Sequence, residues 1–235
     1  MKNLNAPMLT IIDDDGNAKF VTDLLPLIAS KGISISSAVI ANKVGTSPYM
    51  TWSQVEAAYI AGAEILSHTY NNIGSSDISE MTEQEVWYDY VRARHMIESH
   101  GIPSCKYLVY VGGSGSSEKA NGAAKKVYDC AITAHSGATG GNTWNFKGSL
   151  NPYSLRRFRL DESGTTGDVN YNLDTMKALI DHTIQHGGWM IWMMHTSSAA
   201  WTETAKSTIE SAIDYAIDQG LPIVSVDTGY KNYCV

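Results

Sequence analysis

The chain has 235 residues and a formal net charge of −7. The length fits a single domain, 1–235, with a substantial core, because no linker or long-period repeat divides it. The acidic balance argues against binding to nucleic acid and favours a neutral or cationic substrate. No segment approaches the roughly 20 apolar residues of a membrane span, and the start lacks the apolar core of a signal peptide. We expect a soluble protein. An extracellular or virion-associated location would then require an export route other than a signal peptide, or a fusion partner.

Apolar runs alternate with amphipathic segments along the whole chain. Runs bounded by Gly and polar turns predict strands at 9–13, 33–40, 63–69, 106–111, 130–134, 157–160, 189–195 and 223–226. Helical spacing with Thr caps and terminal glycines predicts helices at 20–31, 51–61, 82–100, 118–128, 173–186 and 202–219. Strand and helix repeating at this pitch predict an α/β fold, specifically a distorted or incomplete parallel (β/α) barrel.

A polar, Gly-rich segment at 135–151 interrupts this alternation. It is too long for an ordinary barrel connection, so we interpret it as a loop over the site or a local insertion. His135 borders it and is a candidate substrate contact.

Two stretches place charged side chains at the ends of expected strands. IIDDDG puts Asp14 and Asp15 after the first strand, and AGAEILSHTYNN puts His68 after the third. The carboxyl ends of parallel strands lie side by side, where sheets and barrels assemble their sites. Adjacent carboxylates also repel one another unless a cation or an arginine is near. We interpret these residues as a site for a divalent metal, with an Asp-Gly turn and a structural histidine as the alternative.

The same stretches resemble the first two motifs of the polysaccharide deacetylases, carbohydrate esterase family four, also called the NodB-like homology domain. IIDDDG is similar to [TS]-F-D-D-G, and SHTYNN is similar to H-[ST]-x-x-H. The resemblance implies Asp14 as general base and Asp15 and His68 as ligands of a divalent metal ion, zinc first, with cobalt or nickel as alternatives. Asn72 replaces the second histidine of the motif. As a third ligand its amide oxygen is a poorer zinc donor than imidazole, so we expect weaker zinc binding, a harder metal or a lost site.

The segment LVYVGG at 108–113 resembles the third family motif, F-x-Y-P-Y-G. Val111 replaces the proline and Gly112 the second tyrosine. The resemblance implies the N–H of Gly112 as an oxyanion donor, and we expect Tyr110 to contact substrate. The following GGSGSS lacks the lysine of a P-loop, and Ser114 does not lie in G-x-S-x-G, which argues against a nucleotide site and a serine esterase.

The segment NPYSLRRFRL at 151–160 resembles a family segment, L-P-R-[IF], that supplies an arginine to the site. By this match Arg157 pairs with Asp14 and keeps it ionised. Arg156 and Arg159 lie beside it, and a surface basic cluster is the alternative reading.

The segment WMIWMMHT at 189–196 is apolar on both faces, which is typical of a central strand. It resembles the fifth family motif, L-x-H. The resemblance implies that Met193 lines the acetyl pocket and that His195 is the general acid. We expect Trp189 to contact substrate. The family's own orienting motif for the histidine is not recognisable here, and Asp161 is our candidate for that role.

The segments that resemble the first, second, third and fifth motifs occur in family order across about 200 residues, which is more specific than any one of them. They imply a metal-dependent carbohydrate deacetylase acting on an N-acetylglucosamine polymer, such as peptidoglycan or an exopolysaccharide. One alternative is an O-acetyl esterase acting on xylan. The other is a catalytically impaired glycan-binding or virion structural protein on the same fold.

Overall fold

The computed structural model describes residues 6–112, 114–133, 143–161 and 169–235. Its centre is one seven-stranded sheet with the order β5-β4-β3-β2-β1-β7-β6, and every paired strand runs parallel to its neighbour. The strands are β1 Met8–Asp13, β2 Ser36–Val39, β3 Glu64–Ser67, β4 Tyr107–Val109, β5 Cys130–Ile132, β6 Phe158–Arg159 and β7 Trp189–Met194. Their carboxyl ends therefore meet at one end of the sheet.

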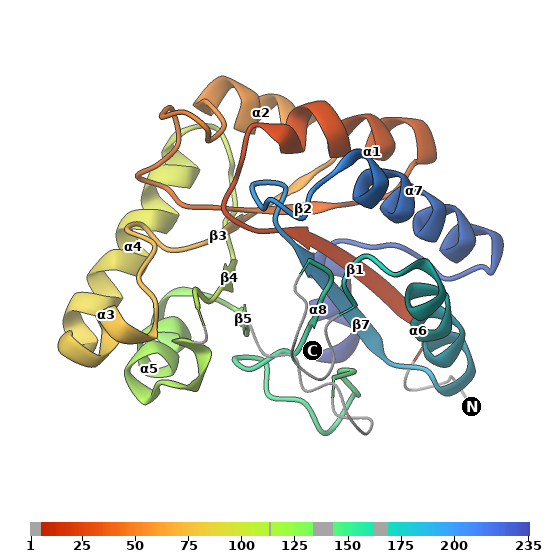
Figure 1. Cartoon of the computed structure of the whole chain (residues 1–235). Coiled ribbons are helices and arrows are strands. Elements are labelled where there is room, and N and C mark those ends of the chain that lie inside the picture. Colours follow the sequence, from red (N-terminus) through yellow and green to blue (C-terminus); the bar gives the residue numbers. More distant parts are fainter. Residues whose placement is uncertain (1–5, 113, 134–142, 162–168) are drawn as a thin grey trace.

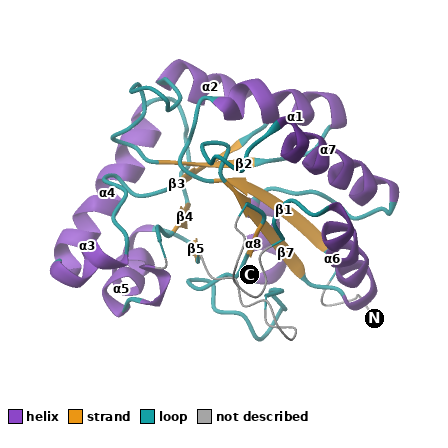
Figure 2. Ribbon diagram, in the orientation of Figure 1, coloured by secondary structure: helices purple, strands orange, loops and turns teal. Residues whose placement is uncertain are grey.

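Helices surround this curled sheet, most of them on its outer face (Figures 1 and 2). They are η1 Phe20–Leu24, α1 Leu25–Lys31, α2 Trp52–Ile60, α3 Ser75–Glu80, α4 Glu83–Ser99, η2 Ser114–Ser116, α5 Glu118–Val127, α6 Leu173–His186, α7 Glu203–Asp218 and α8 Val226–Tyr233. Thr51 and Thr82 cap α2 and α4 in capping boxes, which explains where these two helices begin. None of the described helices has the length and apolar content that crossing a bilayer requires.

The sheet curls into a half-barrel but does not close by direct pairing of β5 with β6. At the open seam, Leu155 makes a parallel bridge with Ile132 and exchanges backbone hydrogen bonds with Ala131 and Thr133. The expected α/β fold, a distorted or incomplete parallel barrel, is confirmed.

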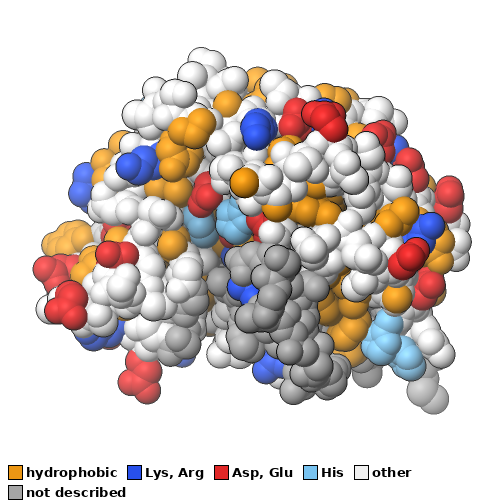
Figure 3. Space-filling view, viewed as in Figure 1, with side chains coloured by type: hydrophobic (Ala, Val, Ile, Leu, Met, Phe, Trp, Pro, Cys, Tyr) orange, Lys and Arg blue, Asp and Glu red, His pale blue; other side chains and the backbone are white. Residues whose placement is uncertain are grey.

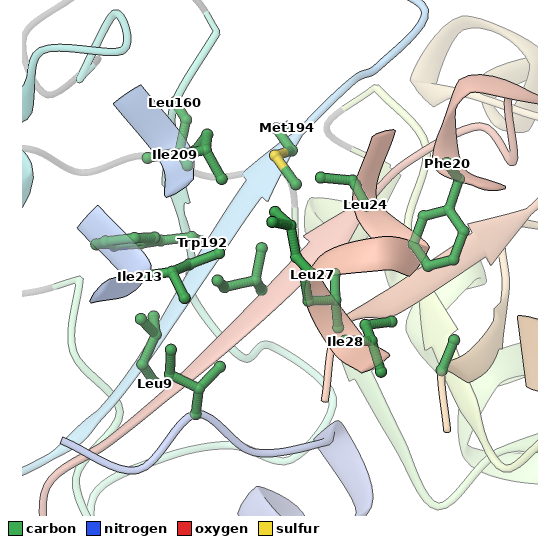
Figure 4. Packing of buried hydrophobic residues seen from close by; sticks show 14 of the residues in the cluster. Leu9, Phe20, Leu24, Leu27, Ile28, Leu160, Trp192, Met194, Ile209 and Ile213 are labelled. Atoms are coloured by element: carbon green, nitrogen blue, oxygen red, sulfur yellow. The ribbon is translucent and has the colours of Figure 1, made fainter. Parts of the chain in front are cut away.

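Two apolar layers hold the barrel together. Between the sheet and the outer helices, Leu9 and Trp192 pack against Leu27 of α1 and Ile213 of α7 (Figure 4). Inside the curl, a second cluster includes Ile12 and is closed at the amino ends of the strands by α8. Burial of these side chains is the main favourable term for folding.

The end of the chain differs from the sequence prediction. The expected strand at 223–226 is wrong: Ile223 makes only an isolated bridge with Leu9, and α8 begins at Val226. Ser225 accepts a hydrogen bond from the N–H of Thr228, which favours a helix here. The hydroxyl of Tyr233 in α8 donates to the carbonyl of Ala6, so the two ends of the described chain lie together.

The long segment between β5 and β6 also differs from expectation where it is described. Asn145 forms an antiparallel bridge with Trp189, the first residue of β7. This part lies at the amino ends of the strands and does not cover their carboxyl ends. His135 lies outside the described residues.

Candidate active site

The side chains of the three successive aspartates, Asp13 to Asp15, each contact a different partner. Asp13 is buried and accepts hydrogen bonds from the N–H and hydroxyl of Thr196, at 2.7 and 3.0 Å. Asp14 points to the inner side of the barrel, and Asp15 turns to His68 and Ser197 in a left-handed conformation with φ 74°. The three carboxylates thereby point in different directions, although burial, and to a lesser extent the charge of Asp14, still raise the pKa of Asp13.

Asp14 forms a bidentate ion pair with Arg157. Both guanidinium N–H groups donate to its two carboxylate oxygens at 2.8 Å, and the two side chains are almost fully buried. The Nε–H of Arg157 donates to the carbonyl of Thr133 at 2.7 Å, which fixes the guanidinium plane. Burial alone would raise the pKa of Asp14, but the charge of Arg157, followed by those of nearby histidines, holds it below its usual value. Asp14 is therefore ionised.

His195 lies across from Asp14 at the end of β7. Its Nε2 is 3.9 Å from the Asp14 carboxylate, and its Nδ1 is hydrogen-bonded to Asp161 at 2.6 Å. Burial disfavours the charged ring, but the Asp161 hydrogen bond and the neighbouring carboxylates outweigh it and raise the pKa of His195 to about 9. The ring is protonated at neutral pH, and its Nε2–H faces the inside of the cleft.

Asp15 and His68 form the second pair of the site, with 3.6 Å between Oδ1 of Asp15 and Nε2 of His68. The Nδ1 of His68 lies 2.9 Å from the carbonyl of Val109, which only accepts, so this nitrogen carries the proton. Burial lowers the pKa of His68. The ring is therefore neutral, and its Nε2 lone pair faces the carboxylate, as in metal-binding histidines.

A buried carboxylate holds the loop that follows His68, and no sequence pattern indicated this role. Asp89 of α4 accepts hydrogen bonds from the N–H groups of Tyr70 and Asn71 and from the Asn71 side chain, at 2.8, 3.1 and 2.8 Å. Thr69 and Asn72 adopt left-handed conformations, with φ 65° and 60°. These conformations are strained for residues other than glycine, so the loop depends on such anchoring.

The remaining cleft residues differ in how accessible they are. Gly112 follows β4 in a left-handed conformation, is exposed, and its N–H has no acceptor within the described chain. Met193 lies on the same side of β7 as Ile191, a member of the inner cluster, just below His195. Figure 3 shows histidine and acidic side chains together at the centre of this face, where the strands end.

Two expected substrate contacts do not fit the structure. Tyr110 has no exposed surface, and its hydroxyl donates to the side chain of Asn121. Trp189 is also fully buried and lies at the start of β7, the opposite end of the strand from His195. Trp189 lies on the same face of β7 as Met193, but five residues separate it from His195 at the cleft.

The donor set of Asp15 and His68 fits a divalent cation. Two ligands bound at about 2.0 to 2.2 Å to one ion lie a little over 3 Å apart, close to the separation seen here. Within the described chain, however, no group of three His, Cys, Asp or Glu side chains is placed to hold a metal. A third protein donor has to be of another type, and Asn72 is exposed at the end of the same loop.

A family model and several solved structures match the chain. The family model for polysaccharide deacetylase matches residues 2–131, more than half of the chain. No curated protein sequence matches. Among solved structures, the chain is similar to the Xyl-CE4 domain of a multidomain xylanase from the hindgut metagenome of Trinervitermes trinervoides. The TM-score is 0.66 at 14% identity, over 98% of this chain and 93% of that one.

Two further structures extend the comparison. One is a family 4 carbohydrate esterase from Streptomyces lividans in complex with acetate, with a TM-score of 0.63 at 13% identity over 94% of each chain. The other is a CE4 family pseudoenzyme from Bacillus anthracis, with a TM-score of 0.59 at 10% identity over 96% of this chain and 66% of that one. These likenesses establish the fold, and together with the family model they show that this chain belongs to the polysaccharide deacetylase family.

Proposed function

We propose that the protein hydrolyses acetyl groups of a polysaccharide with the help of a divalent metal ion, and that its substrate is an N-acetylglucosamine polymer. The observation that carries this proposal is that a proton acceptor and a proton donor face each other in the cleft. Asp14 is ionised and His195 is protonated, 3.9 Å apart in one cleft. Paired groups whose pKa values are pushed apart are typical of general acid–base catalysis.

In the proposed reaction, Asp14 accepts a proton from the water that attacks the acetyl carbonyl carbon. The N–H of Gly112 donates to the oxygen that becomes negative. His195 then gives its Nε2 proton to the nitrogen as the C–N bond breaks, which leaves acetate and a free amine. Asp161 keeps the His195 ring in position, and Met193 provides an apolar wall for the acetyl methyl group.

Asp15 and His68 would hold the metal, with Asn72 as a third donor. When bound there, a divalent cation polarises the acetyl carbonyl and lowers the pKa of water. Zinc suits the imidazole, and cobalt and nickel accept the same ligands. With one imidazole and oxygen donors only, we expect weaker zinc binding than in a site with two histidines.

Acetate release tests this proposal. N-acetylated chito-oligosaccharides and acetylated xylan are incubated with the protein and added zinc, cobalt or nickel. We expect acetate from the chito-oligosaccharides, and none from the Asp14→Asn and His195→Ala variants. Release from xylan alone would instead support the O-acetyl esterase, and release that persists in both variants would contradict the proposed chemistry.

A second candidate is a glycan-binding protein that has lost turnover. The replacement of the second motif histidine by Asn72 favours it, and one similar structure is described as a pseudoenzyme. Binding of chito-oligosaccharides without acetate release at any metal would support this candidate.

A further inference from the structure

A pair of histidines lies outside the cleft, on the surface of α6. His182 and His186 are four residues apart, so they project from the same side of the helix. Their ring centroids are 4.4 Å apart, and the ring planes are inclined at 40°. Figure 3 shows histidine side chains at two separate places on this face, one at the cleft centre and one at the end of α6.

A neighbouring tryptophan limits the movement of this pair. The Trp144 ring packs against His182, with centroids 4.3 Å apart. Its indole N–H donates to the hydroxyl of Thr183 at 2.8 Å, and that hydroxyl donates in turn to the carbonyl of Leu179. The Trp144 ring is thus anchored to α6, and the His182 ring is held beside it.

The ring nitrogens of the two histidines make no hydrogen bond that stabilises the described part of the fold. Neither ring makes a hydrogen bond to any other group in the described parts of the chain, in contrast to His68 and His195 in the cleft. His182 is partly exposed and His186 is exposed, which leaves their nitrogens accessible from solvent. His186 is also the last residue of α6, where the partial negative charge of the terminal carbonyls favours a cation.

We propose that His182 and His186 form a second metal site, separate from the cleft, that binds a divalent transition metal through two imidazoles and water. Two histidines at this helical spacing are a known bidentate arrangement for such ions. In the described chain, no third His, Cys, Asp or Glu joins them. A site with two nitrogen donors and water suits Cu²⁺ best, followed by Ni²⁺ and Zn²⁺.

This site binds metal without performing hydrolysis. In the metalloprotease pattern H-E-x-x-H, a glutamate follows the first histidine and serves as general base. The corresponding residue here is Thr183, which is buried and hydrogen-bonded within the fold. The consequence is structural: a bound ion joins the last two turns of α6.

Copper titration of the protein tests the site. We compare the wild type with His182→Gln, His186→Gln and the double variant, with His95→Gln on the exposed face of α4 as matched control. In calorimetry, we expect the wild type and the control to bind one Cu²⁺ equivalent more than the double variant. Each single variant should bind that equivalent at least ten-fold more weakly. Circular dichroism without metal checks that all variants fold alike.

Spectroscopy then places the bound ion. Cu²⁺ at this site should quench Trp144 fluorescence, and the quenching should be lost in the double variant. The electron paramagnetic resonance signal of this Cu²⁺ should show two coordinated imidazole nitrogens, and one in each single variant. Equal Cu²⁺ stoichiometry and affinity in the wild type and the double variant would overturn the proposal, whatever the activity of the cleft.

Discussion

Arg157 and Asp14, which are 143 residues apart in sequence, form a bidentate ion pair that solvent does not reach. The pair joins the end of β1 to the segment that enters β6. Because the Asp14 carboxylate is buried, it depends on the charge of Arg157 to remain ionised. The protonation state of the proposed base depends on this contact, and the same guanidinium also reaches across the open seam to the carbonyl of Thr133, which follows β5.

Replacement of Arg157 by alanine should therefore cost both activity and stability. Without the guanidinium, burial raises the pKa of Asp14, and the carboxyl no longer accepts a proton at neutral pH. We expect acetate release to fall by about 100-fold or more and the free energy of unfolding by about 3 to 5 kcal/mol. Urea unfolding and acetate assays measure the two effects. The exposed neighbour variant Arg156→Ala is the control, and an active Arg157→Ala protein would contradict the role of the pair.

The activity should decrease on the alkaline side as His195 loses its proton near pH 9. Asp161 raises the pKa of His195, so the Asp161→Asn variant should lose activity at a lower pH than the wild type. The pH profile of kcat/KM measures this shift. An unchanged alkaline limb in Asp161→Asn would show that another group titrates there.

Loss of Asp89 should weaken metal binding although this residue touches no metal. Its carboxylate holds the backbone of the loop between His68 and Asn72. Changes in groups that orient a ligand typically cost about 10- to 100-fold in metal affinity. We expect a loss of this size for zinc in Asp89→Ala, measured by competition with a chelating dye. Gln84→Ala, on the exposed side of α4, should bind zinc as the wild type does.

A histidine at position 72 should strengthen zinc binding. If Asn72 is the third donor, Asn72→His replaces an amide oxygen by an imidazole that zinc prefers. We expect the zinc Kd to fall by about ten-fold or more, with a gain in acetate release. Asn71→His places the same ring one residue earlier and should give no gain. Equal affinities of Asn72→His and wild type would remove Asn72 from the ligand set.

Glu64 should make the stability of the fold depend on pH. Its carboxylate accepts hydrogen bonds from the N–H groups of Val226 and Asp227 at the start of α8, and burial raises its pKa to about 7. The folded protein thus binds this proton more tightly than the unfolded chain. The resulting stabilisation is complete below about pH 4.5 and is lost as the pH rises to about 7.

The matched variant Glu64→Gln removes this titration. Relative to Glu64→Gln, the wild type should lose about 1 to 3 kcal/mol of unfolding free energy between pH 4.5 and 7. Urea unfolding at both pH values measures the difference, with the exposed Glu56→Gln as control. A pH-independent difference would show that Glu64 keeps its charge in the folded state.

The sequence predicted the order of strands and helices well because periodic apolar patterns and helix caps are local signals. The prediction of a strand at 223–226 is wrong because the apolar run there is followed by Ser225, which caps α8. The choice of Arg157 over its neighbours depended on the resemblance, since residues two apart in a strand, such as Arg157 and Arg159, share a face. Asp89 could not be found, because an aspartate on a helix shows no sign of the loop it will contact. The substrate contact expected of Trp189 is wrong because an alternating pattern indicates on which face of a strand a residue lies, but not how far it lies from the end of the strand.

The hydrogen bond between Tyr233 and Ala6 brings both ends of the described chain to the amino-terminal rim of the sheet. The cleft opens at the opposite rim. A module or surface anchor joined at either terminus would therefore attach behind the barrel, and a long glycan strand could cross the front without meeting the tether. The positions of the two ends of the described chain would thus leave the cleft accessible when another domain is joined to either end.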